Sequence, residues 1–105
     1  MTLQKSFGPC ERRFIEVEHE VYGRFRLRSW SGAELAKVTS TGEGLPQMYM
    51  GIAASVVDEN GDLVLTLDAK GIEAMYDDDQ AKLLWLSEHV QKHCMSGTVD
   101  EAVKN

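Results

Sequence analysis

The chain has few cysteines and prolines, two of each among its 105 residues. Two cysteines, Cys10 and Cys94, are too few for a disulfide framework, so we expect reduced thiols in a cytoplasmic protein. No stretch approaches the roughly 20 apolar residues of a membrane helix, and the first residues lack the apolar core of a secretory signal. The sequence therefore predicts no membrane partner.

Positive charge is also scarce. The 11 lysines and arginines face 17 aspartates and glutamates, which gives a net charge of −6. Phosphate backbones and anionic membranes repel an acidic domain, so we expect no nucleic-acid partner. Apolar residues make up 43% of the chain, enough for one small domain with a modest core.

Residues 14–28 alternate between polar and apolar side chains, which predicts two antiparallel strands. Gly23 ends a three-residue connection that begins at Val21, where the backbone needs a left-handed residue. Opposite charges across such a ladder contribute roughly 0.2–1 kcal/mol per pair, so we interpret the arginines as serving the fold rather than a ligand. Counting outward from the connection pairs Glu20 with Arg24, Glu18 with Arg26, Glu16 with Arg28, and Val17 with Leu27 on the other face.

The helix signals begin with a capping box, in which Ser31 and Glu34 satisfy each other's backbone N–H groups. Residues 47–57 form an apolar run that we interpret as a buried helix, with a strand as the alternative. Asn60-Gly61 indicates a turn. We further expect a short helix over 68–76 that buries Ile72, Met75 and Tyr76, and a longer one over 78–95 with an apolar stripe of Leu83, Leu86, Val90 and Cys94.

These elements predict an α+β fold, with a small N-terminal antiparallel β-hairpin packed with a mainly α-helical remainder. We expect a flexible N-terminal arm over residues 1–12, because Gly8-Pro9 interrupts regular structure there. A single domain then spans residues 13–95. The polar residues 96–105 form a flexible tail.

The sequence contains no convincing motif for a metal-binding or catalytic site. The acidic residues 58–62 have their glycine at the wrong position for a calcium loop. His89 and His93 have a helical metal-ligand spacing but no nearby pair to complete a zinc site, and the aspartates 77–79 fit a helix cap better than a metal cluster. No nucleophile elbow, phosphate loop or dinucleotide fingerprint is present. We therefore expect a binding or assembly protein without enzymatic activity, cofactor or metal.

Three segments, read in order, resemble the tail assembly chaperones of long-tailed bacteriophages. "FRLRSWSGAEL" is similar to that family's strand ending in arginine, followed by a helix start. "GIAASVVDENGDLVLT" resembles its central apolar helix and acidic turn, and "DAKGIEAMYDDDQAKLLWLSEHVQK" resembles its short acidic helix and longer closing helix. The resemblance covers roughly residues 12–95. The chain departs from the family pattern at "RSW" and at "LDAKGIEAM".

The resemblance implies a non-enzymatic helper that binds the long tape-measure protein, keeps it soluble and helps to recruit tail-tube subunits. It also implies homo-oligomers, location in the host cytoplasm, absence from the mature virion and, in many members, a longer form made by ribosomal frameshifting. Candidate contact residues are Met48, Tyr49, Leu84 and Trp85, although core packing is the alternative role for each. Competing classes are a small virion structural protein, such as a tail-completion or connector component, another phage protein-binding module, and an acidic DNA mimic.

Overall fold

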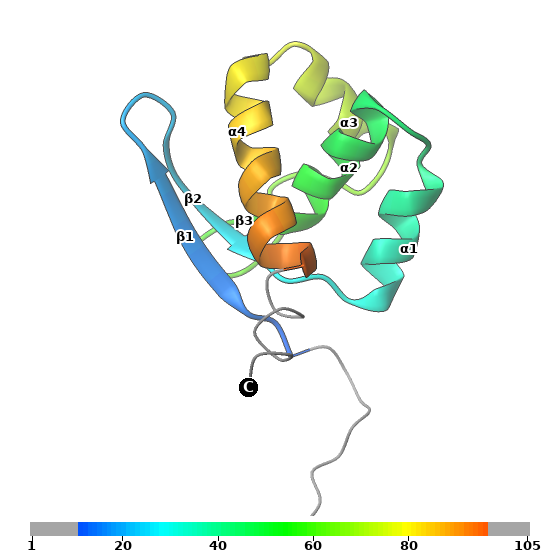
Figure 1. The fold of residues 1–105 in the computed structure, drawn as a ribbon, viewed down its shortest axis with the longest axis horizontal. Helices are drawn as coiled ribbons and strands as arrows, with labels where there is room; N and C mark the ends of the chain where they lie inside the picture. Colours follow the sequence, from blue (N-terminus) through cyan, green and yellow to red (C-terminus); the bar gives the residue numbers. More distant parts are fainter. Residues whose placement is uncertain (1–10, 97–105) are drawn as a thin grey trace, which may run out of the picture.

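The computed structural model describes the backbone of residues 11–96 and the side chains of residues 11–94. The fold class is α+β, as predicted, with an antiparallel sheet in the order β1-β2-β3 beside a group of helices (Figure 1). A π-helical turn, Gln91–Ser96, continues the last helix. The elements in chain order are β1 (Phe14–His19), β2 (Gly23–Arg28), α1 (Gly32–Ser40), α2 (Leu45–Ser55), β3 (Val56–Val57), α3 (Ala69–Tyr76) and α4 (Gln80–Val90).

The core is centred on α2, which packs against α1, α3 and α4. Ile52 and Ala53 of this helix are at most 2% exposed, so the apolar run is the buried helix that the sequence predicts. The last two residues of the apolar run lie beyond the helix and form β3, so the strand alternative holds for these two residues alone. The predicted stripe of α4 is confirmed, because Leu83, Leu86, Val90 and Cys94 all belong to the same core.

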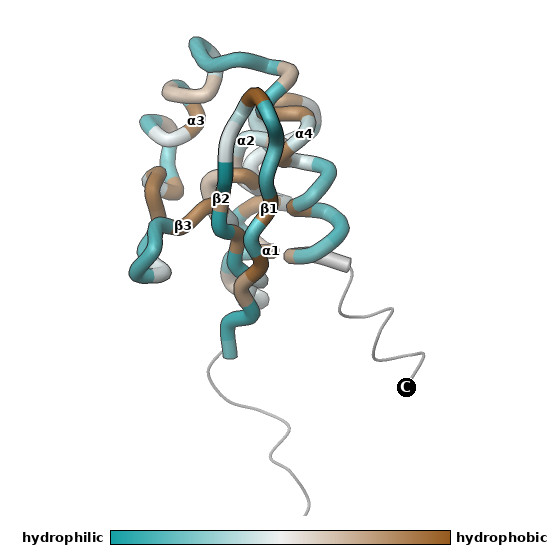
Figure 2. Tube along the Cα trace, turned by 90° about the vertical axis from the view of Figure 1, so that its left-hand side faces the viewer, coloured by the Kyte–Doolittle hydropathy of each residue, from teal (hydrophilic) through white to brown (hydrophobic). Residues whose placement is uncertain are grey.

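The hairpin has the predicted faces but a different register. Figure 2 shows hydrophobic and hydrophilic positions alternating along β1 and β2. Every predicted pair is nevertheless wrong by two residues. The observed partners are Phe14 with Arg28, Ile15 with Leu27, Glu16 with Arg26, Val17 with Phe25, Glu18 with Arg24 and His19 with Gly23.

The turn explains this shift. His19 Nδ1 accepts hydrogen bonds from the backbone N–H groups of Val21 at 3.0 Å and Tyr22 at 3.4 Å, which ends β1 one residue before Glu20. Gly23 then opens β2 with φ of 92°, the left-handed backbone that favours glycine. A slip of two residues keeps every side chain on its face, so the alternation could not distinguish the two registers.

The connection from β3 to α3 is compact. Asp58 begins the predicted turn, and Gly61, with φ of 87°, donates a hydrogen bond to the Asp58 carbonyl at 3.0 Å. Val57 then bridges to Leu63. The Thr66 carbonyl approaches α3 so closely that a Cβ on Gly71 would lie 2.0 Å from it. Glycine is therefore needed where this loop meets α3.

The helix boundaries agree with expectation to within a few residues. Asp79 caps α4 by accepting from the Ala81 N–H at 3.0 Å, as the acidic run predicts. Met75 is buried, but Tyr76 is 49% exposed, so the prediction that Tyr76 is buried was wrong.

The predicted arm and tail lie mainly outside the described residues, as do the C-terminal residues where a frameshift would occur. Arg12, assigned to the flexible arm, is instead held by Ser29 and Glu34. Within the described part of the chain, no helix is long and apolar enough to cross a membrane.

Candidate protein-binding groove

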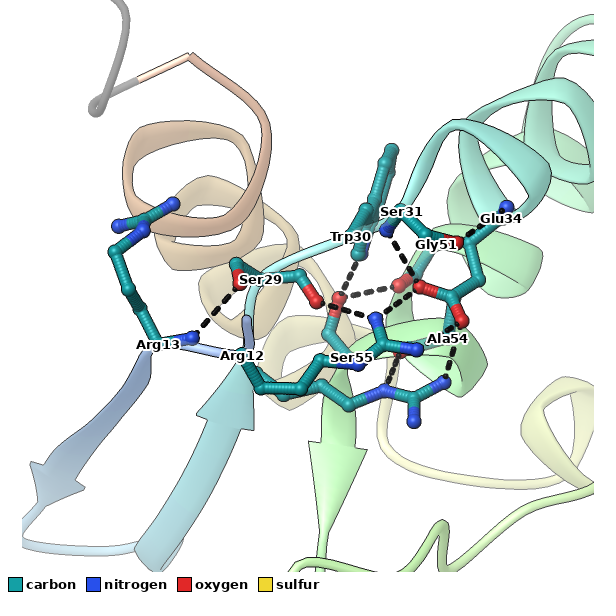
Figure 3. A network of polar contacts seen from close by, with 10 residues as sticks. Arg12, Arg13, Ser29, Trp30, Ser31, Glu34, Gly51, Ala54 and Ser55 are labelled. Atoms are coloured by element: carbon teal, nitrogen blue, oxygen red, sulfur yellow. Dashed lines mark hydrogen bonds and ion pairs between the residues drawn. The ribbon is translucent and has the colours of Figure 1, made fainter. Parts of the chain in front are cut away.

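The start of α1 is fixed by a carboxylate that binds two arginines (Figure 3). Glu34 Oε2 accepts from Arg12 Nη2 at 2.6 Å and from Arg28 Nη2 at 3.2 Å, and Glu34 Oε1 also contacts Arg12. The predicted capping box is confirmed, because Ser31 N–H donates to Glu34 Oε1 at 2.8 Å and Glu34 N–H donates to Ser31 Oγ at 3.3 Å. Above all through the Arg12 hydrogen bond, the pKa of Glu34 is lowered from 4.5 to about 2.

The same arginines connect α1 to the sheet and to α2. Arg12 donates to the Ser29 carbonyl at 2.8 Å, and Arg28 Nε donates to the Ala54 carbonyl at 2.9 Å. Both guanidinium groups therefore satisfy carbonyl oxygens at the ends of β2 and α2 as well as the carboxylate. Through Arg28, this network connects the start of α1 to the C-terminal end of α2.

Trp30 lies between these two helices. Its indole N–H donates to Ser55 Oγ at 2.7 Å, and Ser55 Oγ donates to the Gly51 carbonyl at 2.7 Å. A Cβ on Gly51 would lie 3.4 Å from the Trp30 ring, so the ring rests against the bare helix backbone. The buried hydroxyl and the indole thus satisfy each other.

A groove of about 520 Å³ opens beside Trp30, between α1, α2 and α4. Leu35 and Val38 line it from α1, and Val90 lines it from α4. None of its lining side chains is charged, although 28 of the 105 residues are Asp, Glu, Lys or Arg. The lining is completed by Trp30, Thr39, Gly44, Gln47, Met48, Gly51, Ser87 and Gln91. An uncharged groove of this kind accepts apolar groups without the cost of removing water from charges.

The structure separates the four predicted contact residues. Met48 lines the groove, but Tyr49 is fully buried and therefore has the alternative role, core packing. Tyr49 OH instead bonds Gln80, and its ring packs edge-on against Tyr76 with centroids 4.9 Å apart.

The two candidates on α4 face different surroundings. Leu84 is 55% exposed and lies one helical turn before Ser87, so it extends the groove-facing side of α4. Trp85 is packed against the hairpin, with its ring centroid 5.2 Å from that of His19 and 6.0 Å from that of Phe25. Trp85 therefore anchors the hairpin to α4.

The arginines of β2 bind different partners from those predicted. Glu18 pairs with Arg24 at 3.6 Å, not with Arg26. Arg26 donates to the Glu59 carbonyl at 3.0 Å and lies over the Phe14 ring, 4.5 Å from its centroid. Each of these arginines contacts the chain itself, which agrees with the interpretation that they serve the fold.

Sequence reasoning missed three residues on which the groove depends: Trp30, Leu35 and Arg12. A tryptophan immediately before a capping box was the available signal for Trp30, since the box places that residue beside the new helix. Nothing in the sequence linked Arg12 to Glu34, 22 residues away.

The remaining candidate chemistry does not form a site. His89 and His93 stack with ring centroids 5.7 Å apart. Across the described residues, no group of three or more His, Cys, Asp or Glu side chains is placed to hold a metal ion. Cys94 is a buried free thiol whose pKa is raised by burial.

Comparison of the chain with protein-family models, with curated proteins and with solved structures gives no match.

Proposed function

We propose that this protein is a non-enzymatic tail assembly chaperone of a long-tailed bacteriophage, which binds the tape-measure protein and keeps it soluble. Two independent lines support the proposal. One is the order of the three sequence segments that resemble this family. The other is the groove, whose surface suits an apolar partner rather than a reactive substrate.

The observation that carries the proposal is the absence of charge from the groove lining. A long helical protein exposes apolar side chains along its helices, and such helices bind in apolar grooves through residues spaced by three or four positions. Leu35, 40% exposed at the rim, and Met48 provide apolar contacts for them. The net charge of −6 keeps the complex in solution after its apolar surface is covered.

The wider proposal follows the family. The protein acts in the host cytoplasm, self-associates along the tape-measure protein, helps to bring in tail-tube subunits through a frameshifted longer form, and leaves before the virion is complete. The gene neighbourhood tests this directly. We expect a following reading frame in −1 register and then a very long gene for a helical protein.

Co-expression tests the groove. The long helical protein encoded downstream should become soluble in the presence of this protein, and Leu35→Glu should remove most of that effect, because it places a charge at the apolar rim. Val21→Glu is the matched control, since Val21 is 78% exposed at the hairpin turn, outside the groove. Equal loss with both variants, or no solubilisation by the unaltered protein, would contradict the proposal.

The competing class, a small virion structural protein, makes a different prediction. A tail-completion or connector component remains in the particle, whereas a chaperone departs. Mass spectrometry of purified virions distinguishes them, and detection at stoichiometric levels would favour the structural protein.

A further inference from the structure

The outer edge of β1 has unpaired backbone groups. β1 is the first strand in the sheet order β1-β2-β3, and Figure 1 shows no described helix or strand on its outer side. The Ser29 N–H donates to the Arg13 carbonyl at 2.9 Å, which identifies this pair as hydrogen-bonded. Because such pairs alternate along an antiparallel ladder, Phe14, Glu16 and Glu18 direct their N–H and C=O groups outward.

This edge also has an unmatched negative charge. Glu16 lies directly across from Arg26, but the Arg26 guanidinium is engaged by the Glu59 carbonyl and the Phe14 ring. Among the described residues Glu16 therefore has no ion-pair partner. Glu18 has one, Arg24, but at 3.6 Å with both side chains about two-thirds exposed.

We propose that the outer edge of β1 binds an extended segment of another protein in which basic residues alternate with apolar ones. The segment adds a fourth strand to the sheet, through the outward groups of Phe14, Glu16 and Glu18. Its basic side chains lie beside Glu16 and Glu18, and its apolar side chains continue the inner face of the sheet. The inner edge of β1 already pairs with a strand of this kind, because β2 has the alternating sequence GRFRLR.

A second copy of β1 is a poor partner for the same edge. Antiparallel pairing of two FIEVEH strands brings glutamates opposite or diagonal to glutamates on the exposed face. Like charges across a ladder destabilise it. At neutral pH the outer edge of β1 therefore disfavours pairing with a second β1 and favours a basic strand. This edge is a different surface from the groove, and its partner differs from the apolar partner of the groove.

A synthetic peptide with the sequence of residues 22–29, YGRFRLRS, acetylated and amidated at its ends, is a suitable probe. Amide hydrogen exchange followed by NMR gives the readout. On binding, the amides of Phe14, Glu16 and Glu18 should exchange more slowly, and those of Ile15 and Val17 should not change. Slower exchange only outside β1, or changes centred on Ile15 and Val17 from displacement of β2, would overturn the proposal.

Two variants and a second peptide separate charge from backbone pairing. Glu16→Lys should weaken binding about tenfold, because it reverses the unmatched charge. Glu16→Pro removes only an outward N–H, so the sheet should persist while the peptide no longer protects β1. The peptide YGEFELES should bind at least about tenfold more weakly than YGRFRLRS.

The outcomes are decisive in either direction. Binding that is equal for both peptides, or that survives both variants unchanged, overturns the proposal. If Glu16→Pro unfolds the protein, Glu16→Lys and the exchange pattern still decide.

Discussion

An arginine at each end of β2 forms an ion pair with a glutamate, but one pair is exposed to solvent and the other is shielded from it. Near the turn, Glu18 and Arg24 face each other at 3.6 Å, with 68% and 65% of their side chains exposed. At the other end, Glu34 binds Arg28 at 3.2 Å, and both side chains are only 12% exposed. The exposed pair is screened by water and salt, whereas the shielded carboxylate interacts at a lower effective dielectric.

The difference lies in the number of fixed partners as well as in burial. Glu34 binds two guanidinium groups and the Ser31 N–H, and its arginines also hold carbonyl oxygens of the backbone. Glu18 has one ion-pair partner, Arg24, whose side chain is 65% exposed. Of the two ion pairs at the ends of β2, the one that organises the fold is therefore the one whose charges are held by backbone groups.

The largest expected effect comes from removing the shielded charge. Glu34→Gln keeps an oxygen for the helix cap but leaves Arg12 and Arg28 without their carboxylate. We expect the free energy of unfolding at pH 7 to fall by about 3 kcal/mol, measured by urea denaturation. Glu18→Gln is the control and should change it by less than about 0.5 kcal/mol. Similar losses for the two variants would remove the distinction between the two ends.

The pH dependence of stability should follow the same carboxylate. The pKa of Glu34 is about 2 in the folded protein and 4.5 without its partners, so its ionised form stabilises the fold. This contribution is complete above about pH 4.5 and is lost as the pH falls towards 2. The full shift corresponds to about 3 kcal/mol, and partial solvent access reduces it to about 2 kcal/mol. Thermal unfolding of Glu34→Gln over this range should show a correspondingly flatter curve, and parallel curves would contradict the assignment.

The helix cap beside this cluster should contribute less. Ser31→Ala removes the acceptor for the Glu34 N–H but leaves the arginine–carboxylate contacts in place. We expect a loss of about 1 kcal/mol in the free energy of unfolding. Ser40→Ala, at the exposed end of the same helix, provides the comparison. A loss as large as that of Glu34→Gln would mean that the cap, and not the charge, holds α1.

The smallest effect is expected at the exposed pair. A double-mutant cycle on Glu18 and Arg24 should give a coupling of about 0.2–0.5 kcal/mol. The cycle on Glu18 and Arg26, which are not paired in this register, should be additive within error. Coupling in the second cycle and none in the first would restore the register expected from the sequence.

Local signals predicted much of the fold. The alternation of residues 14–28 gave the hairpin and its faces, the capping box gave the start of α1, and the apolar stripe gave α4. The predicted register was wrong because the register depends on hydrogen bonds that the turn N–H groups donate to His19 Nδ1, and these leave no trace in the alternation.

The groove depended on contacts that no local pattern contains. Its walls come from α1, α2 and α4, and the start of α1 is held by Arg12, which lies 22 residues before Glu34 and meets it only after folding. Tyr49 and Met48 are adjacent in an apolar run, yet one is buried and the other lines the groove. The rotation of α2 about its own axis decides which of the two side chains is buried and which faces the groove. Tertiary packing sets that rotation.

The positions of the two tryptophans give the molecule two separate optical reporters. Trp30 lines the groove, and Trp85 packs against the hairpin. With Trp85 changed to Phe, the emission of Trp30 should respond to an apolar partner in the groove and stay constant when a basic strand is added to β1. Binding in the groove can therefore be followed by fluorescence separately from strand addition at β1, without an attached dye.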